Sequence, residues 1–154
     1  MSLFPKKPCR KRDSRFRRLL VFFVAGTALF AACSRAMPVN FKPGEYSCDL
    51  CRMNITDMRF KTEAISPKGK IFHFDSVECL LSWSQLHSGE WATRWVTDFY
   101  HPDKWIELDK AFLLKSERLA SPMGENLSAY SSEDDFKRAA QEFGGNPFNA
   151  KTMK

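Results

Sequence analysis

The chain has 154 residues, with 24 Lys and Arg against 18 Asp and Glu, for a formal net charge of +6. Residues 1–32 hold eight basic residues and one acidic residue, whereas residues 33–154 hold 16 basic and 17 acidic residues, so the net charge is +7 in the first part and −1 in the second. Nucleic-acid-binding domains carry positive charge on the folded surface, so this balance excludes one. Fourteen Phe and four Trp exclude a disordered chain.

The first residues predict an export signal. The basic stretch runs into fourteen uncharged residues, 19–32. A membrane-spanning helix needs about 20 apolar residues, so this run is too short to span but is typical of a secretory signal. Its end, Leu29-Phe-Ala-Ala-Cys33, resembles a bacterial lipoprotein signal, in which the Cys is lipidated and becomes the mature N-terminus. The alternative is an ordinary Cys33 after a cleaved signal or a short anchor.

We therefore expect a signal peptide over residues 1–32, lipidation of Cys33 and a flexible tether over residues 33–45, which contain Pro and Gly and show no periodic pattern. The folded domain would then face the periplasm. Ser34 stands where an Asp would favour retention in the inner membrane of enteric bacteria. We expect an anchor in the outer membrane, with the inner membrane as the alternative.

The next part of the chain predicts a hairpin, a helix and a strand. Strands over 59–65 and 70–74 flank a turn at 67–69, where Pro and Gly interrupt the pattern. Asp75 is expected to cap a helix over 76–87, with Glu78 three residues later as in a capping box. Gly89 would end this helix. A strand over 95–100 follows.

A similar order recurs in the rest of the chain. A turn over 101–104 leads to strands over 105–108 and 111–116, and a loop over 121–124 precedes a strand over 127–130. Ser132 is expected to cap a helix over 133–143, which Gly144 and Gly145 stop. The polar tail, 146–154, is expected to fray. The sequence thus predicts an α+β domain over 46–145 made of two weakly related halves, each a hairpin followed by a helix.

Sulfur-containing side chains form the most informative pattern. Cys48 and Cys51, two residues apart on a tight turn, can meet one ion, and Met53 adds a thioether. Cys79, at the start of the predicted helix, is a third thiol that this helix start brings toward the turn. Met123 lies in the Ser121-Pro-Met-Gly124 loop, where its turn-forming neighbours expose it. Zinc seldom uses a thioether, whereas the soft ion Cu(I) accepts both Cys and Met.

Three other interpretations stay open on the residues alone. Cys48 and Cys51, or either of them with Cys79, would form a structural disulfide in an oxidising compartment. Cys48 and Cys51 would alternatively be a thiol–disulfide redox pair. A zinc-type site would take three Cys and His73 or His87 as a fourth ligand. We find no arrangement typical of an active site, so an enzyme is not expected.

Several motifs follow one another along the chain: the lipoprotein signal, Cys48-x-x-Cys51-x-Met53, Phe74-Asp75 with Cys79-Leu80-Leu81, Trp95-Val96-x-Asp98, Trp105-Ile106 and Ser121-Pro-Met-Gly124. Together they resemble the NosL family of accessory lipoproteins of nitrous oxide reductase assembly. The resemblance covers residues 46–145. It implies a domain of two ββαβ halves and a membrane-anchored periplasmic chaperone that binds Cu(I).

The resemblance also implies ligands and partners. Cys51, Met53 and Met123 are the first copper-ligand candidates, followed by Cys48 and then Cys79. The implied partners are an ABC-transporter-linked complex that matures nitrous oxide reductase, and the reductase itself. The chain departs from the family pattern in two places. Phe30 replaces the usual Leu of the lipoprotein signal, and a final strand of the second half would be missing after the last helix.

Overall fold

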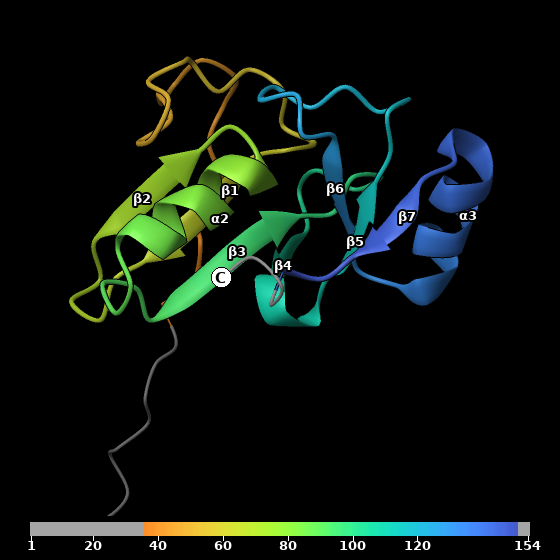
Figure 1. The fold of residues 1–154 in the computed structure, drawn as a ribbon. Coiled ribbons are helices and arrows are strands. Elements are labelled where there is room, and N and C mark those ends of the chain that lie inside the picture. The colour runs from red at the N-terminus through yellow and green to blue at the C-terminus, as the bar shows by residue number, and fades with distance from the viewer. Residues whose placement is uncertain (1–35, 151–154) are drawn as a thin grey trace, which may run out of the picture. The chain divides into compact units, whose positions relative to one another are not determined.

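The structure, a computed structural model, describes residues 36–150 (Figure 1). The predicted signal peptide and the predicted lipidation site at Cys33 lie outside these residues. The described elements are β1 (Thr62–Ile65), β2 (Ile71–Phe74), α2 (Val77–Leu86), β3 (Thr93–Thr97), β4 (Trp105–Glu107), the 3-10 turn η1 (Leu108–Lys110), β5 (Phe112–Lys115), β6 (Leu127–Tyr130), α3 (Glu133–Phe143) and β7 (Asn146–Phe148). None of the helices in this part of the chain is both long and apolar enough to cross a membrane.

The two halves share one topology. The first sheet has the strand order β2-β1-β3-β4 and the second has the order β6-β5-β7. In each half the strand after the helix pairs antiparallel with the first strand of the hairpin, so β1-β2-α2-β3 and β5-β6-α3-β7 are both ββαβ units. In Figure 1, α2 lies across the first sheet and α3 lies beside the second. The predicted α+β class with two ββαβ halves is confirmed.

The last strand was not expected from the sequence. Residues 146–148, predicted as part of a frayed tail, form β7, which pairs with β5 and supplies the final strand of the second half. Gly145 makes this pairing possible, because its backbone has a φ of +102° and a Cβ there would collide with the Lys115 carbonyl oxygen. The prediction that this strand is missing was wrong.

The start of α2 also differs from the prediction. Ser76, not Asp75, is the N-cap residue, and its side chain accepts a hydrogen bond from the Cys79 backbone N–H. Ser and Asp are both good caps, so local sequence does not choose between neighbours. Ser76 is fully buried under the helix start. Asp75 therefore does not cap the helix, and its side chain contacts Cys51 instead.

The segment expected to be a tether packs on the domain from residue 36 onward. Phe41 is buried, and the Val39 N–H donates to the carboxylate of the fully buried Glu63 in β1 at 3.1 Å. The Asn40 side chain accepts a hydrogen bond from the Trp105 indole. Residues 37–46 therefore cover part of the first sheet rather than hanging free.

The core consists of two clusters, and each of them includes residues of both halves. Val77, Leu80, Leu81 and Trp83 bury the inner side of α2 within a larger cluster, and a second cluster surrounds Tyr130 near α3. A large apolar side chain contributes roughly 1.5–3 kcal/mol when it is fully buried. The first cluster includes Cys48 and Cys79, so the same packing that stabilises α2 fixes two of the thiols.

Candidate metal centre

The loop over residues 47–54 holds two of the thiols. An antiparallel bridge joins its two ends, the Cys48 N–H donates to the Met53 carbonyl at 2.8 Å, and the Arg52 N–H donates to the Cys48 carbonyl at 3.0 Å. Arg52 takes a positive φ of 68° to close the turn, a conformation that costs energy for a residue with a Cβ. The closed turn presents Cys48 and Cys51 on one side.

Asp49 fastens this loop to the end of β2. Its N–H donates to the His73 carbonyl and its carboxylate accepts from the His73 N–H, both at 2.8 Å. Two residues after His73 comes Asp75, and the Cys51 thiol donates a hydrogen bond to Asp75 Oδ2 at 3.2 Å. The loop is thus held against the short connection between β2 and α2.

Four side chains meet at this junction. One ligand atom each from Cys48, Cys51, Asp75 and Cys79 lies within 4.8 Å of all the others. Cys48, Asp75 and Cys79 are buried, and Cys51 is partly exposed. These three cysteines are free thiols, so the alternative of a structural disulfide among them is not formed in the structure. The loop, the β2–α2 connection and the first turn of α2 together bring these four ligand atoms to one place, where Cys51 is the most exposed of the four residues.

The thiols differ in their acidity. A hydrogen bond from the Cys79 thiol lowers the pKa of Cys48 to about 6, against the opposing effect of burial. Backbone N–H groups of Leu50, Cys51 and Asp75 add to this lowering, because hydrogen bonds to a thiolate favour the charged form. Cys48 is therefore the thiolate of the cluster at neutral pH.

The other two thiols keep their protons. Burial raises the pKa of Cys51 to about 11, and its hydrogen bonds to Cys48 and Asp75 add to the increase. Donation to Cys48 raises the pKa of Cys79 well above its usual range, and burial raises it further. A metal ion that takes all three sulfurs must therefore displace two protons.

Asp75 is a member of the cluster that the sequence pattern did not reveal. It was interpreted as a helix cap, whereas its Oδ2 accepts from Cys51 and its buried Oδ1 has no hydrogen-bond partner among the described residues. A buried carboxylate oxygen without a partner is unfavourable. This oxygen is thus available to a bound ion.

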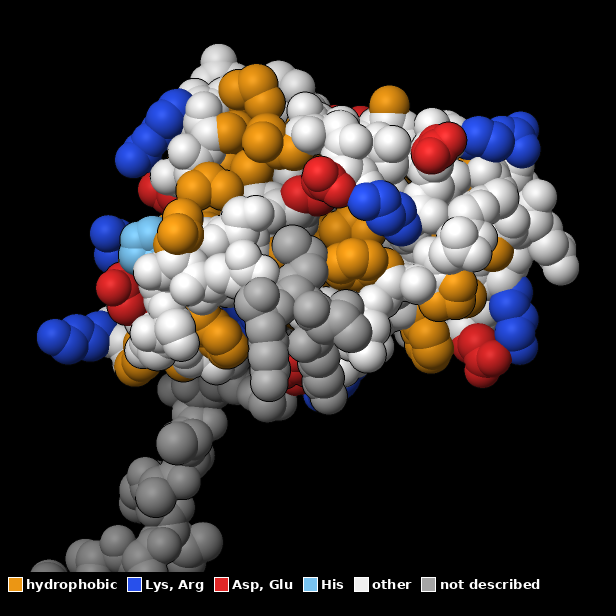
Figure 2. Space-filling model, viewed as in Figure 1, with side chains coloured by type: hydrophobic (Ala, Val, Ile, Leu, Met, Phe, Trp, Pro, Cys, Tyr) orange, Lys and Arg blue, Asp and Glu red, His pale blue; other side chains and the backbone are white. Residues whose placement is uncertain are grey.

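The two predicted methionine ligands lie in exposed loops. Met53 follows Cys51 by two residues and is 45% exposed, and Met123 is 42% exposed. Their side chains are open to solvent, unlike the buried Cys48 and Cys79. Figure 2 shows hydrophobic side chains emerging at several separate places on one face rather than as a single continuous patch. The role of both methionines as ligands stays a prediction.

The histidines do not join the thiol cluster. His73 Nδ1 lies 3.2 Å from Glu63 Oε1, and the imidazole stacks on Tyr46 with ring centroids 4.0 Å apart. His87 Nδ1 is bonded to the Trp83 carbonyl at 3.0 Å. Neither His73 nor His87 belongs to the group whose ligand atoms meet at the thiols, so the structure offers neither as the fourth ligand of the zinc-type hypothesis; the fourth member of that group is Asp75.

A second group of possible ligands has a structural explanation. Asp98, His101 and Asp135 also bring their ligand atoms within 4.8 Å of one another. The Asp98 carboxylate, however, accepts hydrogen bonds from the backbone N–H groups of Tyr100, His101 and Ser131. These bonds hold the turn after β3, so Asp98 already has its partners.

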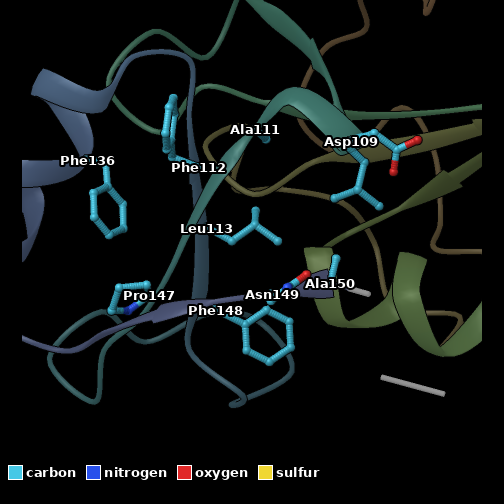
Figure 3. Close-up of a pocket in the computed structure, with 10 residues that line it drawn as sticks. Asp109, Ala111, Phe112, Leu113, Phe136, Pro147, Phe148, Asn149 and Ala150 are labelled. Atoms are coloured by element: carbon cyan, nitrogen blue, oxygen red, sulfur yellow. The ribbon is translucent and has the colours of Figure 1, made fainter. Parts of the chain in front are cut away.

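A shallow cavity in the second half carries no comparable chemistry. It has a volume of about 280 Å³ and is lined by residues of β5, α3 and β7, including Phe112, Phe136 and Phe148 (Figure 3). The single ionisable residue of its lining is Asp109, which accepts a hydrogen bond from Arg94 at 3.2 Å. No thiol or thioether lines it. The thiol cluster is the stronger candidate site.

Comparison with known proteins places these features in context. The sequence model of the NosL family matches residues 38–154. The crystal structure of the copper chaperone NosL from Shewanella denitrificans is similar in fold, with a TM-score of 0.63 and 19% sequence identity over 73% of this chain and 92% of that chain. A search of curated proteins finds no match.

Proposed function

Because the chain belongs to the NosL family, we propose that it is a periplasmic Cu(I) chaperone that delivers copper for assembly of the copper centres of nitrous oxide reductase. The observation that carries the proposal is the cluster of three free thiols, Cys48, Cys51 and Cys79, around one point. A thiol cluster of this kind favours soft metal ions. The likeness in fold to the copper chaperone from Shewanella denitrificans supports the choice of copper.

The spacing of the sulfurs suits a single ion. Metal–thiolate bonds are about 2.3 Å long for zinc, so two thiolates on one ion of that size lie at most roughly 4.6 Å apart. The ligand atoms of the cluster lie within 4.8 Å of one another, so binding requires only a small inward movement. Cys48, already ionised, offers the first strong bond, and Cys51 and Cys79 follow as they lose their protons.

The sulfur-containing residues differ in their exposure to solvent, and this difference supports a metal carrier rather than a permanently bound metal ion. Cys48 and Cys79 are at most 1% exposed, whereas Cys51 is partly open and Met53 is 45% exposed. An ion therefore enters and leaves on the Cys51 side. A partner's thiolate, thioether or imidazole can approach there and form a bond before Cys51 is released, so free Cu(I) is never exposed.

The same difference in exposure argues against the main alternative, a thiol–disulfide redox protein. A thiol–disulfide enzyme needs a nucleophilic thiolate that its substrate can reach. The low-pKa thiol here is Cys48, which is 0% exposed. Cys51, the accessible thiol, has its pKa raised to about 11. The acidity and the accessibility belong to different residues, which suits a metal carrier and does not suit redox exchange with a protein substrate.

The proposal includes a location and partners. A lipid on Cys33 would hold the domain at the periplasmic side of a membrane, the outer one by preference, where it would meet the ABC-type maturation complex and the reductase itself. The short distance along the chain between Cys33 and the packed Phe41 would keep the domain close to the membrane. These parts of the proposal rest on the sequence motifs and on the family.

Mass spectrometry under native conditions tests the binding function. The reduced protein should gain the mass of one copper ion when Cu(I) is supplied, and the Cys51→Ser variant should lose tight binding. A thiol–disulfide protein would instead show a reversible mass loss of two hydrogens and no copper adduct. Uptake of one Zn(II) but no Cu(I) would favour the zinc-type alternative and contradict the copper proposal.

A further inference from the structure

Glu78 joins the two halves of the protein beside the thiol cluster. It precedes Cys79 in the first turn of α2 and is 5% exposed. Its Oε1 accepts a hydrogen bond from the Ser121 hydroxyl and another from the Leu127 N–H, the latter at 3.0 Å. Ser121 begins the loop that carries Met123, and Leu127 begins β6. One carboxylate oxygen thus fastens both ends of this loop to the helix of the first half.

The loop itself is closed by hydrogen bonds that converge on Ser121. Its hydroxyl accepts from the Asn126 N–H at 2.9 Å, and its carbonyl accepts from the Gly124 N–H at 3.0 Å. Asn126 takes a positive φ of 61°, which turns the chain back toward β6. Met123, at the tip of this closed loop, is exposed, whereas the residues that anchor the loop are buried. Its position relative to Cys79 therefore depends on Glu78.

We propose that Glu78 is a positioning residue that holds the Met123 thioether where it can bind Cu(I) held by the thiols. This inference rests on the proposed function and deepens it. A thioether is a weak neutral ligand, so it contributes only when the loop that bears it is already ordered near the ion. The bond from Glu78 to Ser121 supplies that order, and it makes the copper site a feature completed by both halves of the chain.

The capping-box interpretation of Glu78 does not explain this arrangement. A capping-box carboxylate turns back to the N-cap backbone N–H, whereas the Glu78 carboxylate extends to residues 43 and 49 positions further along the chain. Helix capping does not require hydrogen bonds from the Glu78 carboxylate to residues this far along the chain, so we call this contact a clamp between the helix and the loop. A clamp that only stabilises the fold is the competing explanation, and a double-mutant cycle separates the two.

The cycle uses Cu(I) competition titrations. Glu78→Ala should weaken Cu(I) binding about 10- to 100-fold, the range seen when residues that orient metal ligands are removed. Glu78→Gln, whose amide oxygen can accept both hydrogen bonds, should recover most of the wild-type affinity. Met123→Ala should weaken binding to a similar extent, and adding Glu78→Ala to Met123→Ala should cause little further loss.

These titrations distinguish failure of the proposed function from failure of the inference about Glu78. If the wild-type protein binds no Cu(I), the proposed function fails. If the wild-type protein binds Cu(I) but Met123→Ala has no effect, or Glu78→Ala weakens binding equally with and without Met123, Glu78 does not act through Met123 and the inference is overturned. Should Glu78→Ala not fold, Ser121→Ala replaces it in the same cycle, because it removes the hydroxyl that donates to Glu78 and keeps the bond from the Leu127 N–H, although the bond from the Asn126 N–H to this hydroxyl is lost as well.

Discussion

The Cys51 thiol donates a hydrogen bond to Asp75 Oδ2 at 3.2 Å, although the two residues are 24 positions apart in the chain. The bond joins the loop that carries Cys48 and Cys51 to the short connection that precedes the helix of Cys79. It also gives the one partly exposed thiol of the cluster a carboxylate partner, and this hydrogen bond raises the pKa of the thiol. Metal capture and proton release are therefore coupled at the open side of the site.

Replacing Asp75 by Asn should make Cys51 more acidic. The hydrogen bond from Cys51 to the carboxylate raises the pKa of the thiol, and an Asn amide can instead donate to the thiolate, which favours the charged form. Titration of thiolate absorbance in the metal-free protein should show the Cys51 pKa below its wild-type value of about 11. An unchanged or higher value would mean that Asp75 does not control this thiol.

Copper affinity should rise with pH. Cys48, with a pKa of about 6, is ionised at neutral pH, whereas Cys51 and Cys79 keep protons that Cu(I) must displace. Each displaced proton changes the apparent affinity about tenfold per pH unit, so two protons give roughly 100-fold between about pH 7 and about pH 8. Below the pKa of Cys48 a third proton competes with Cu(I), so the affinity changes more steeply with pH.

Chelator competition across this pH range measures the slope. The chelator's own protonation must be corrected for at each pH. An affinity that does not change between about pH 7 and about pH 8 would indicate that the ion displaces no proton from Cys51 or Cys79, so that these two thiols are not among its ligands.

The Ser76 cap should support both stability and metal binding. Ser76→Ala removes the hydrogen bond that the Cys79 N–H donates at 3.2 Å and should lower the free energy of unfolding by about 0.5 to 2 kcal/mol. Since the same bond fixes the backbone of Cys79, Cu(I) affinity should fall as well. Urea denaturation and Cu(I) competition titrations provide the two measurements.

Ser132→Ala is the matched control for this prediction. Ser132 caps α3 through the Asp135 N–H at 3.1 Å, in the other half and away from any thiol. It should lower stability to a similar extent and leave Cu(I) affinity unchanged. Equal losses of affinity in both variants would show that general destabilisation, and not the position of Cys79, weakens binding.

Much of the fold could be predicted because its signals are local. Ser132 and the acidic residues after it define α3, and the bounds 133–143 and 127–130 agree with the structure. The turn at Gly69, with a φ of +82°, separates β1 from β2 as expected. β7 could not be predicted, because residues 146–148 show no alternation and pair only with the distant β5.

The candidate site was predicted in part, because some of its signals are local as well. The spacing of Cys48 and Cys51 predicts a turn on which both thiols can meet one ion, although a disulfide or a redox pair stays open on the sequence alone, and the helix start predicted at Cys79 brings in the third thiol. Asp75 and Glu78 were both interpreted as helix-capping residues, because the local pattern fits that role. Their actual partners, Cys51 and Ser121, are 24 and 43 residues away, and no local pattern records a contact over such distances.

Met53 should contribute to Cu(I) binding and not to the stability of the fold. The side chain is 45% exposed, and exposed substitutions usually change stability by less than about 0.5 kcal/mol. Met53→Ala should therefore leave the urea midpoint unchanged while lowering Cu(I) affinity. Met37→Ala, at a methionine that is 66% exposed and precedes the domain's first strand, is the control and should change neither. A Met53 variant with wild-type affinity would remove Met53 from the ligand set.

X-ray absorption at the copper edge identifies the atoms that bind the ion. The reduced protein, loaded with one equivalent of Cu(I), should give a spectrum of monovalent copper whose nearest neighbours are mainly sulfur, and Cys51→Ser should reduce the number of those sulfurs. Nearest neighbours that are mainly nitrogen or oxygen, or a spectrum that Cys51→Ser leaves unchanged, would contradict a thiol-based copper carrier.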